Sequence, residues 1–320
     1  AYISFRFLLR GIGYMITPML IRAILVIFNI ILDPILIFGV GSLGIPALGV
    51  TGAAIATASA RTIAAIVGIY LLFNGRVNIN LSLKDLKLKF SWIKKIIQIG
   101  LPATMARAGS ALGFIFLFAI VAVFGEKPVA AYGIGRRVVH IITIAIWGFA
   151  GASMTMVGQN VGAEQKERAE DIVKKSIMVA LLIMFSISGM MVLFRESIIQ
   201  AFINDAEVIS IGADYLLIFA LSIPFFGVYR IFDSTYRGTG HTVPAMGLSL
   251  FRIWILRLGL SAALAFPVID LLLFEIDFGL GMGEIGIWIG MALSNFLIAF
   301  LSLGYFLTGH WKKKTIEERE

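Results

Sequence analysis

The sequence predicts an all-α polytopic membrane protein with eight complete transmembrane helices. Of its 320 residues, 59% are hydrophobic and 14% are charged, whereas about a quarter of the residues in soluble globular proteins are charged. The apolar residues form continuous runs that are long enough to cross a hydrocarbon layer of about 30 Å, which requires roughly 20 helical residues. These runs are apolar on all sides and do not alternate as strands do, which favours buried or lipid-facing helices.

The predicted spans follow one another with short connections. They cover residues 16–38, 48–73, 96–124, 129–157, 172–194, 209–236, 243–266 and 285–307. Lys and Arg are concentrated in residues 76–95, 164–175 and 312–314, whereas the segments 39–47 and 267–284 contain neither. The positive-inside rule then places the basic segments and the C-terminus in the cytoplasm, and the sides alternate consistently through all the spans. We expect a multi-pass protein of the plasma membrane.

Several classes of site are excluded by residue content. The chain contains no cysteine, which excludes disulfides, thiolate catalysis and Cys-ligated metals. Its three histidines, His140, His241 and His310, lie in different segments and form no ligand cluster. The net charge of +8 lies partly in the loops described above, so we interpret it as membrane topology and expect no nucleic-acid partner.

Asp33-Pro34 lies inside the first apolar run and predicts a cation-binding or proton-binding site. A carboxylate in hydrocarbon costs roughly 2.5–3.5 kcal/mol on insertion scales, so acids that persist in spans usually have a function. Pro34 has no N–H, which leaves the carbonyl of Ile30 without its helical donor. Asn29 precedes Asp33 by four residues and lies on the same helical face. Such an oxygen-rich site suits Na⁺ or H⁺, and we expect no other metal and no cofactor.

An internal repeat relates the two ends of the chain. Arg10-Gly-x-Gly13 precedes Thr17-Pro18 and an apolar helix, and Arg237-Gly-x-Gly240 precedes Val243-Pro244 and another apolar helix. Repeats of this kind are typical of secondary transporters, whose substrate sites lie between two bundles. By symmetry, roughly 130 residues holding about three and a half helices are expected in front of Ala1. We therefore expect the chain to be a fragment.

In their order and spacing, motifs along almost the whole chain resemble the MATE (multidrug and toxic compound extrusion) family, archaeal-like branch. They comprise Arg10-Gly-x-Gly13 with Thr17-Pro18-Met19-Leu20, Asn29-Ile-Ile-Leu-Asp33-Pro34, the segment 48–57, Gly100-Leu-Pro-Ala103, the segments 130–135 and 157–163, and Arg237-Gly-x-Gly240. The resemblance implies twelve helices in two lobes and a cation-coupled efflux antiporter that exports organic or drug-like compounds by alternating access. It implies no enzyme activity. We expect small-molecule substrates, contacts with membrane lipids and a monomeric protein.

The same resemblance implies the domain organisation. Residues 1–74 would end the N-terminal lobe, with its last two helices and the tail of the preceding one. Residues 75–95 would form a cytoplasmic linker, residues 96–308 a complete six-helix C-terminal lobe, and residues 309–320 a cytoplasmic tail.

Cation-site residues also follow from the resemblance. In the archaeal-like branch an aspartate of the first helix joins Asn and Asp of the fifth helix and Thr of the sixth, which correspond here to Asn29, Asp33 and Thr51. The first-helix aspartate would precede Ala1, so an incomplete site is expected. A bacterial sodium-driven branch has acids at positions that correspond to Ser110 and Phe226. Neither is acidic here, which argues against that branch's mechanism.

Arginine is unusually frequent in the C-terminal spans. Asp233 is available to pair with Arg230 at a spacing of three residues, and we expect Arg252 to extend to the membrane surface or to bond to carbonyls. Arg107 and Arg257 lie near mid-span and are candidates for a cationic substrate cavity that accepts an anionic or phosphate-bearing molecule.

Three alternatives to cation-coupled efflux remain. A flippase or exporter of an anionic or lipid-linked substrate is favoured by the arginine surplus. A membrane-embedded prenyltransferase would need paired acids for Mg²⁺-diphosphate, and no DDxxD-like pair faces the cytoplasm. An ion channel would need a repeated filter or ring-forming element, which is not visible in the sequence.

Overall fold

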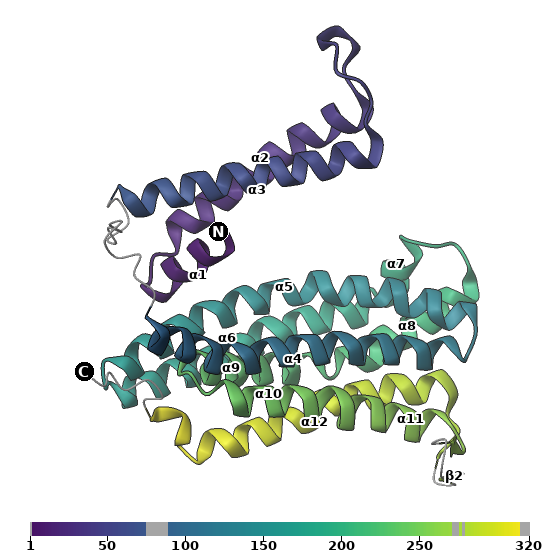
Figure 1. Cartoon of the computed structure of the whole chain (residues 1–320). Helices are drawn as coiled ribbons and strands as arrows, with labels where there is room; N and C mark the ends of the chain where they lie inside the picture. Colours follow the sequence, from purple (N-terminus) through teal and green to yellow (C-terminus); the bar gives the residue numbers. More distant parts are fainter. Residues whose placement is uncertain (1, 75–88, 271–274, 277–278, 314–320) are drawn as a thin grey trace. The chain divides into compact units, whose positions relative to one another are not determined.

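The computed structural model describes residues 2–74, 89–270, 275–276 and 279–313, and it divides the chain into two compact units (Figure 1). The N-unit comprises Ala1–Phe90 and the C-unit comprises Ser91–Glu320. Of the predicted linker, residues 75–88 lie outside the described residues, as do residues 314–320 of the predicted tail. The lobe boundaries given above stay a prediction.

The N-unit is a hairpin of two long helices with a shorter helix at its base (Figure 1). Its elements are α1 (Tyr2–Gly11), α2 (Ile16–Phe38), the 3₁₀ turn η1 (Gly41–Leu43) and α3 (Gly49–Phe73). The buried face of α3 is a stripe of mainly small residues repeated every four positions, Gly52, Ala56, Ala60, Ala64, Gly68 and Leu72. A Cβ at Gly52 would lie 2.3 Å from the carbonyl oxygen of Leu36, so the start of α3 touches the backbone of α2. Small residues allow this close approach between helices in a membrane.

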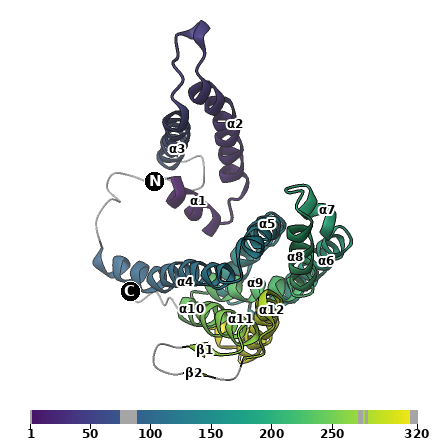
Figure 2. The same ribbon diagram turned by 90° about the vertical axis from the view of Figure 1, so that its right-hand side faces the viewer.

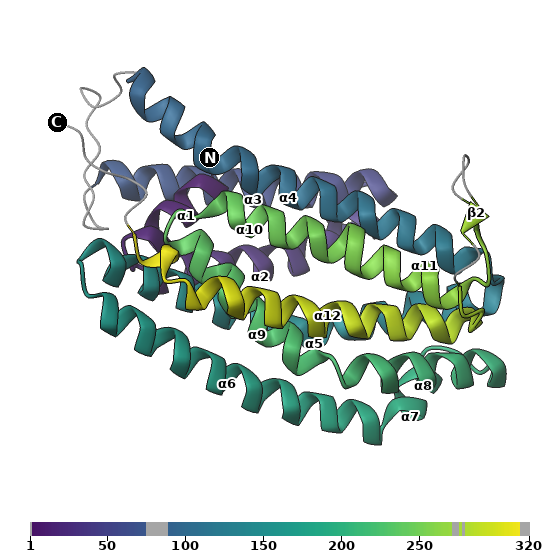
Figure 3. The same cartoon turned by 90° about the horizontal axis from the view of Figure 1, so that it is seen from below.

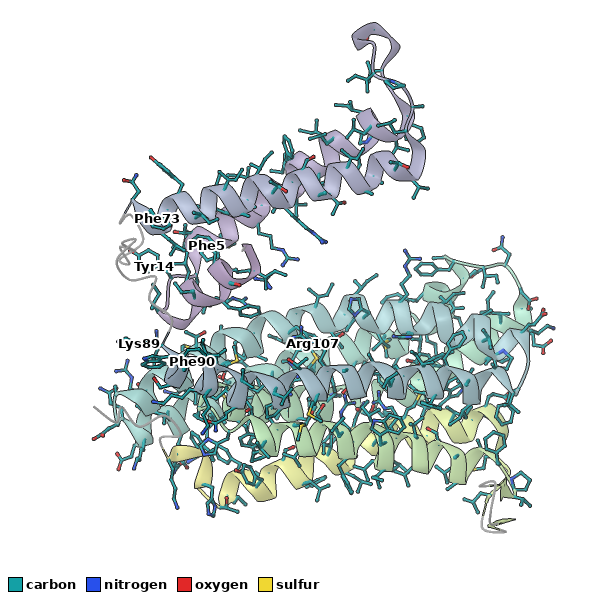
Figure 4. The ribbon with its side chains drawn as sticks, in the orientation of Figure 1. Phe5, Tyr14, Phe73, Lys89, Phe90 and Arg107 are labelled. Carbon is teal, nitrogen blue, oxygen red and sulfur yellow. The ribbon has the colours of Figure 1, made fainter. Side chains whose placement is uncertain are left out.

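The base of the hairpin is a small hydrophobic cluster. Phe5 and Leu9 of α1 are buried together with Leu72 of α3. Figure 4 shows Phe5 and Tyr14 at this end of the N-unit, where α3 ends near Phe73. Both α2 and α3 leave large apolar side chains exposed elsewhere along their length.

The C-unit is a bundle of long helices. Its helices are α4 (Phe90–Ala122), α5 (Glu126–Gly162), α6 (Lys166–Leu193), α7 (Arg195–Gln200), α8 (Ala206–Ala220), α9 (Ile223–Gly238), α10 (Thr242–Leu250), the π-helix η3 (Phe251–Gly259), α11 (Leu260–Ala265), α12 (Gly283–Leu307) and the 3₁₀ turn η4 (His310–Lys312). In the loop before α12, β1 (Ile269–Asp270) pairs antiparallel with β2 (Glu275–Ile276), a hairpin that the sequence analysis did not predict. Across the bundle, α6 packs on α9, α9 on α12, and α12 on α11 (Figures 2 and 3).

The helices agree with the predicted spans, so the all-α polytopic fold is confirmed. Within the described residues, seven helices are long and apolar enough to cross a membrane, or up to eight if α8 and α9 form one span. The predicted span 209–236 corresponds to α8 and α9, which meet at an angle of 51°. Pro224 stands in the first turn of α9, where proline is tolerated only at the start of a helix, and this accounts for the break.

Aromatic rings fill the centre of the C-unit. Tyr132, Tyr215 and Trp288 are fully buried and come from α5, α8 and α12. The Trp288 ring centroid lies 5.7 Å from that of Tyr132 and 4.9 Å from that of Tyr215. These contacts join three helices that are far apart in sequence, and so they fix the framework on which the polar residues of the C-unit are held.

At one end of the C-unit, the last described residues pack on the start of α6. Trp311 is fully buried, stacks on Phe306 and donates a hydrogen bond to the Phe306 carbonyl at 3.0 Å. Lys312 pairs with Glu170, which also pairs with Lys174 at 2.8 Å. Lys312 therefore meets Glu170 of the predicted cytoplasmic segment 164–175 at this end of the unit.

Candidate functional site

The Asp33 region of α2 has the local geometry that the sequence predicts. The side-chain amide of Asn29 donates a hydrogen bond to Oδ1 of Asp33 at 3.0 Å. Both residues are half-buried in the N-unit, and Pro34 continues the helix after Asp33. No ion pair to Asp33 is found among the described residues. The hydrogen-bond partner of the carboxylate is therefore a neutral amide.

Thr51 lies in the first turn of α3 and is exposed. Its neighbour Gly52 touches the backbone of Leu36, three residues beyond Asp33 on α2. The fold thus brings the start of α3 to within about one helical turn of the carboxylate. Asn29 and Asp33 are hydrogen-bonded to each other in the structure. The participation of Thr51 in the same cation site stays a prediction.

A second acid, Asp233, lies inside the C-unit and has different partners. Its side chain is 2% exposed and pairs with Arg230 at 2.6 Å and with Nε of Arg237 at 2.9 Å. The guanidinium carbon of Arg230 also lies 4.1 Å from the ring centroid of Trp147 on α5. The predicted pair between Arg230 and Asp233 is confirmed. Arg237 was missed, although its spacing of four residues from Asp233 gave a signal for it.

Arg257 is held by neutral partners on another helix. Its Nε donates to Oγ of Ser294 at 3.0 Å, and one of its terminal nitrogens donates to Oδ1 of Asn295 at 2.7 Å. Asn295 in turn donates to Oγ of Ser222 at 3.0 Å, in the break between α8 and α9. This network links η3, α12 and the α8–α9 bend. The role of Arg257 in a substrate cavity stays a prediction.

Arg252 lies on the same π-helix, and its guanidinium lies against aromatic side chains of α9. Its side chain is 7% exposed, and its guanidinium carbon lies 5.6 Å from the Phe226 ring centroid and 5.2 Å from that of Tyr229. Among the described residues, Nε and Nη1 of Arg252 have no hydrogen-bond partner. The prediction that Arg252 extends to the membrane surface is wrong, because aromatic side chains of α9 bury it. Long π-helical segments are rare, and short ones often occur at functional sites.

The other predicted positions lie on α4 and α9. Arg107 is exposed and lies about midway along α4 (Figure 4), and its role in a cavity stays a prediction. The Ser110 hydroxyl lies 3.3 Å from the Ser249 hydroxyl, which joins α4 to α10. Phe226 faces Arg252. At the two positions where the sodium-driven branch has acids, the chain therefore has a hydroxyl pair and a ring beside a guanidinium.

The described residues contain no group of three or more His, Asp or Glu side chains that could hold a metal ion. Asp33 and Asn29 form a polar pair in the N-unit, and Arg252 and Arg257 lie on one π-helix of the C-unit.

The chain is similar in sequence to known proteins. The family described as MatE matches residues 102–263, which are 162 of the 320 residues. A "probable multidrug resistance protein NorM" of Thermotoga maritima is 29% identical over 316 residues, covering 99% of this chain and 65% of the relative. An "FAD transporter" of Shewanella oneidensis is 27% identical over 277 residues, covering 83% of this chain and 61% of the relative.

Solved structures show the same fold. An outward-facing multidrug resistance MATE transporter superimposes with a TM-score of 0.82 at 23% identity, covering 95% of this chain and 65% of that one. The chain thus spans about two thirds of the length of the proteins that it matches.

Proposed function

Because the chain belongs to the MATE family, we propose that the complete protein is a cation-coupled efflux antiporter that exports organic, drug-like compounds by alternating access. The observation that carries the proposal is the hydrogen-bonded pair of Asn29 and Asp33 beside Pro34 in an apolar helix. Relatives that are named as multidrug resistance proteins support the same reading. The transported compound and the ion would bind to different parts of the protein.

Asp33 would act as the ion-binding residue. The amide of Asn29 orients one carboxylate oxygen, so the other oxygen is free to receive a proton or to bind Na⁺ together with neighbouring neutral oxygens. Neutralising a carboxylate in an apolar helix removes much of the cost of holding a charge there. The neutral and charged forms of Asp33 would therefore favour different packings of α2 against its neighbours.

This difference would couple the ion gradient to transport. An ion shifts a conformational equilibrium only by its differential affinity for the two states, and each tenfold difference is worth about 1.4 kcal/mol. A tenfold gradient of H⁺ or Na⁺ supplies a similar free energy per ion. A modest preference of the ion for one packing would therefore suffice to drive the export of a compound against a comparable gradient.

The test measures export of a fluorescent organic cation from proteoliposomes that contain the complete protein. Wild type and Asp33→Asn are compared under a Na⁺ gradient and, separately, under a pH gradient. We expect gradient-driven export in wild type and a loss of at least tenfold in the variant, and the effective gradient identifies the ion. Asp214→Asn is the matched control, because Asp214 is an exposed carboxylate on α8. Equal export by wild type and Asp33→Asn would refute the role of Asp33.

A second candidate function is export or flipping of an anionic or lipid-linked substrate. The observation that favours it is the pair of buried arginines, Arg252 and Arg257, on one π-helix. A relative named as an FAD transporter is consistent with an anionic substrate. If wild type exports no organic cation under either gradient, anionic substrates become the leading candidates.

The location and partners follow from the same proposal. The chain is a multi-pass membrane protein, and we infer that it acts as a monomer in the plasma membrane, with lipids around it and its C-terminus in the cytoplasm. The basic residues in segments 76–95, 164–175 and 312–314 support that orientation. Cysteine accessibility of a single Cys placed at Lys313, in a chain that has none, tests the side: labelling from outside intact cells would overturn it.

A further inference from the structure

The charges inside the C-unit are unbalanced. Asp233 is paired with Arg230 and Arg237, so its carboxylate is already shared by two guanidiniums. Arg252 and Arg257 add two more positive charges, and both side chains are buried. Four guanidiniums against one carboxylate leave a surplus of three positive charges within this group. A surplus of this size inside an apolar bundle calls for an anion.

Arg257 and Arg252 differ in what remains available for binding. Nε and a terminal nitrogen of Arg257 are used by Ser294 and Asn295. Arg252 keeps two nitrogens, Nε and Nη1, without a hydrogen-bond partner among the described residues. A buried guanidinium donor that has neither water nor a protein acceptor is strongly unfavourable, so an acceptor from outside the protein would be bound firmly.

The surroundings of Arg252 supply further contacts of the right kind. Phe226 and Tyr229 lie against its guanidinium from α9, which holds the side chain in place. Ser249 lies one turn before Arg252, and its hydroxyl approaches that of Ser110 on α4 at 3.3 Å. Hydroxyls and a guanidinium together are common partners of a phosphate group.

We propose that Arg252 binds the phosphate group of a transported molecule, with Ser110 and Ser249 as neutral partners. A phosphate monoester carries a charge of about −1.5 to −2 near neutral pH, so it offsets the surplus better than a carboxylate does. The inference rests on the proposed transport function, because Arg252 is 7% exposed and becomes accessible only when the C-unit opens during transport. The proposal gives Arg252 the substrate-binding role that the sequence suggested for Arg107 and Arg257.

The experiment compares ligands that differ only in a phosphate. Equilibrium binding of flavin mononucleotide and of riboflavin to the purified complete protein is measured by flavin fluorescence, and binding of farnesyl phosphate and farnesol is measured by competition. We expect one phosphate-bearing ligand to bind at least tenfold more tightly than its phosphate-free counterpart. Preference for flavin mononucleotide identifies a soluble substrate, whereas preference for farnesyl phosphate identifies a lipid-linked one.

Variants then assign that preference to a residue. Arg252→Gln is expected to abolish it while leaving riboflavin or farnesol binding unchanged. Arg168→Gln, at an exposed arginine on α6, is the matched control, and Arg107→Gln tests the other predicted cavity position. Removing an unpaired charge should leave the melting temperature equal or higher, so a folded variant is expected. Arg252→Lys keeps the charge but not the fork of donors, and we expect it to reduce the preference severalfold.

Three outcomes would overturn the assignment: wild type shows no phosphate preference, the preference survives in Arg252→Gln, or Arg107→Gln removes it instead. If Arg252→Gln does not fold, an unchanged preference in Arg252→Lys overturns it. Binding needs no ion gradient, so the result is separate from the export assay. If the phosphate preference depends on Arg252 but no gradient drives export, the proposed ion coupling is refuted and the phosphate site is kept. If a gradient drives export but no phosphate preference is found, only the phosphate site is refuted.

Discussion

Each of the two units has a carboxylate in an apolar helix, but the hydrogen-bond partners of the two carboxylates differ. Asp233 of the C-unit is 2% exposed and lies between the guanidiniums of Arg230 and Arg237. Asp33 of the N-unit is half-buried and accepts a hydrogen bond from the neutral amide of Asn29. A carboxylate that already lies between two guanidiniums has little tendency to bind another cation, whereas a neutral amide partner does not compete with a cation in this way. We therefore propose that the partners of an acid, more than its burial, separate a structural acid from one that exchanges an ion.

The largest expected difference between the two acids is in their contribution to the stability of the protein. Asp233→Ala leaves two guanidiniums without their acid in the C-unit, and we expect a loss of about 3–5 kcal/mol in the free energy of unfolding. Asp33→Ala breaks no ion pair among the described residues and should cost less than about 1.5 kcal/mol. Thermal unfolding of both variants in detergent checks the difference. Equal losses in the two variants would show that the acids play similar structural roles.

A second substitution that removes one of the arginines should compensate in part for the loss of the Asp233 charge. In Asp233→Asn combined with Arg237→Gln, one charge of each sign is removed, so the double variant should recover about 1–3 kcal/mol relative to Asp233→Asn alone. A double-mutant cycle on the melting temperature measures the coupling. Additive effects would contradict the account of Asp233 as a shared partner of the arginines.

The neutral network around Arg257 should give an intermediate effect. Asn295→Leu removes the acceptor of Arg257 and the donor to Ser222, and we expect a loss of about 1–3 kcal/mol. Because the network spans the α8–α9 bend, the loss should be accompanied by faster hydrogen exchange at residues 219–223. Asn160→Leu is the control, because the amide of Asn160 is exposed and bonds to Met156 within its own helix. Similar losses in both variants would argue against a special role for the bend.

The partner of Asp33 should affect coupling more than stability. Asn29→Ala removes the amide that donates to Oδ1 of Asp33, and losing this half-buried hydrogen bond should cost less than about 1.5 kcal/mol. If Na⁺ is the coupling ion, its concentration for half-maximal export should change about tenfold or more, with the melting temperature nearly unchanged. An unchanged ion dependence would remove Asn29 from the proposed site.

The smallest expected effect concerns an acid outside the spans. Asp205 caps α8 and accepts hydrogen bonds from the backbone N–H groups of Val208 and Glu207, which lower the pKa of its carboxyl below the usual value. Its contribution to stability is therefore fully present above the ordinary pKa of about 3.9 and is lost as the pH falls through the lowered value. Asp205→Ala should lower the melting temperature slightly at pH 7, and this difference should shrink as the pH falls below about 4. A constant difference across this range would contradict the cap.

Contacts within one helix could be predicted from the sequence. Asn29 with Asp33 and Arg230 with Asp233 follow from spacings of four and three residues, because a helix places such side chains on one face. Arg237 obeys the same rule, because it follows Asp233 by four residues. The break at residues 221–222 had a signal in Pro224, but an apolar run of full length concealed it.

Contacts between helices could not be predicted in this way. Arg257 finds its acceptors 37 and 38 residues away on α12, and the Ser110 and Ser249 hydroxyls are 139 residues apart. Arg252 lies five residues before Arg257 on the same π-helix, yet its position against α9 leaves two of its nitrogens without acceptors. No local pattern distinguishes the two arginines, because the difference depends on which side chains the neighbouring helices present.

The sequence by itself determined that the chain is a set of membrane-spanning helices, and it located an acid and its amide partner within one of them. This follows because backbone hydrogen bonds in a membrane must be satisfied within each segment, which makes the spans a local property of composition and length. Only the tertiary structure decided which charges are neutralised and which are not. Neutralisation depends on atoms from different helices coming within hydrogen-bonding distance, and packing alone sets that distance.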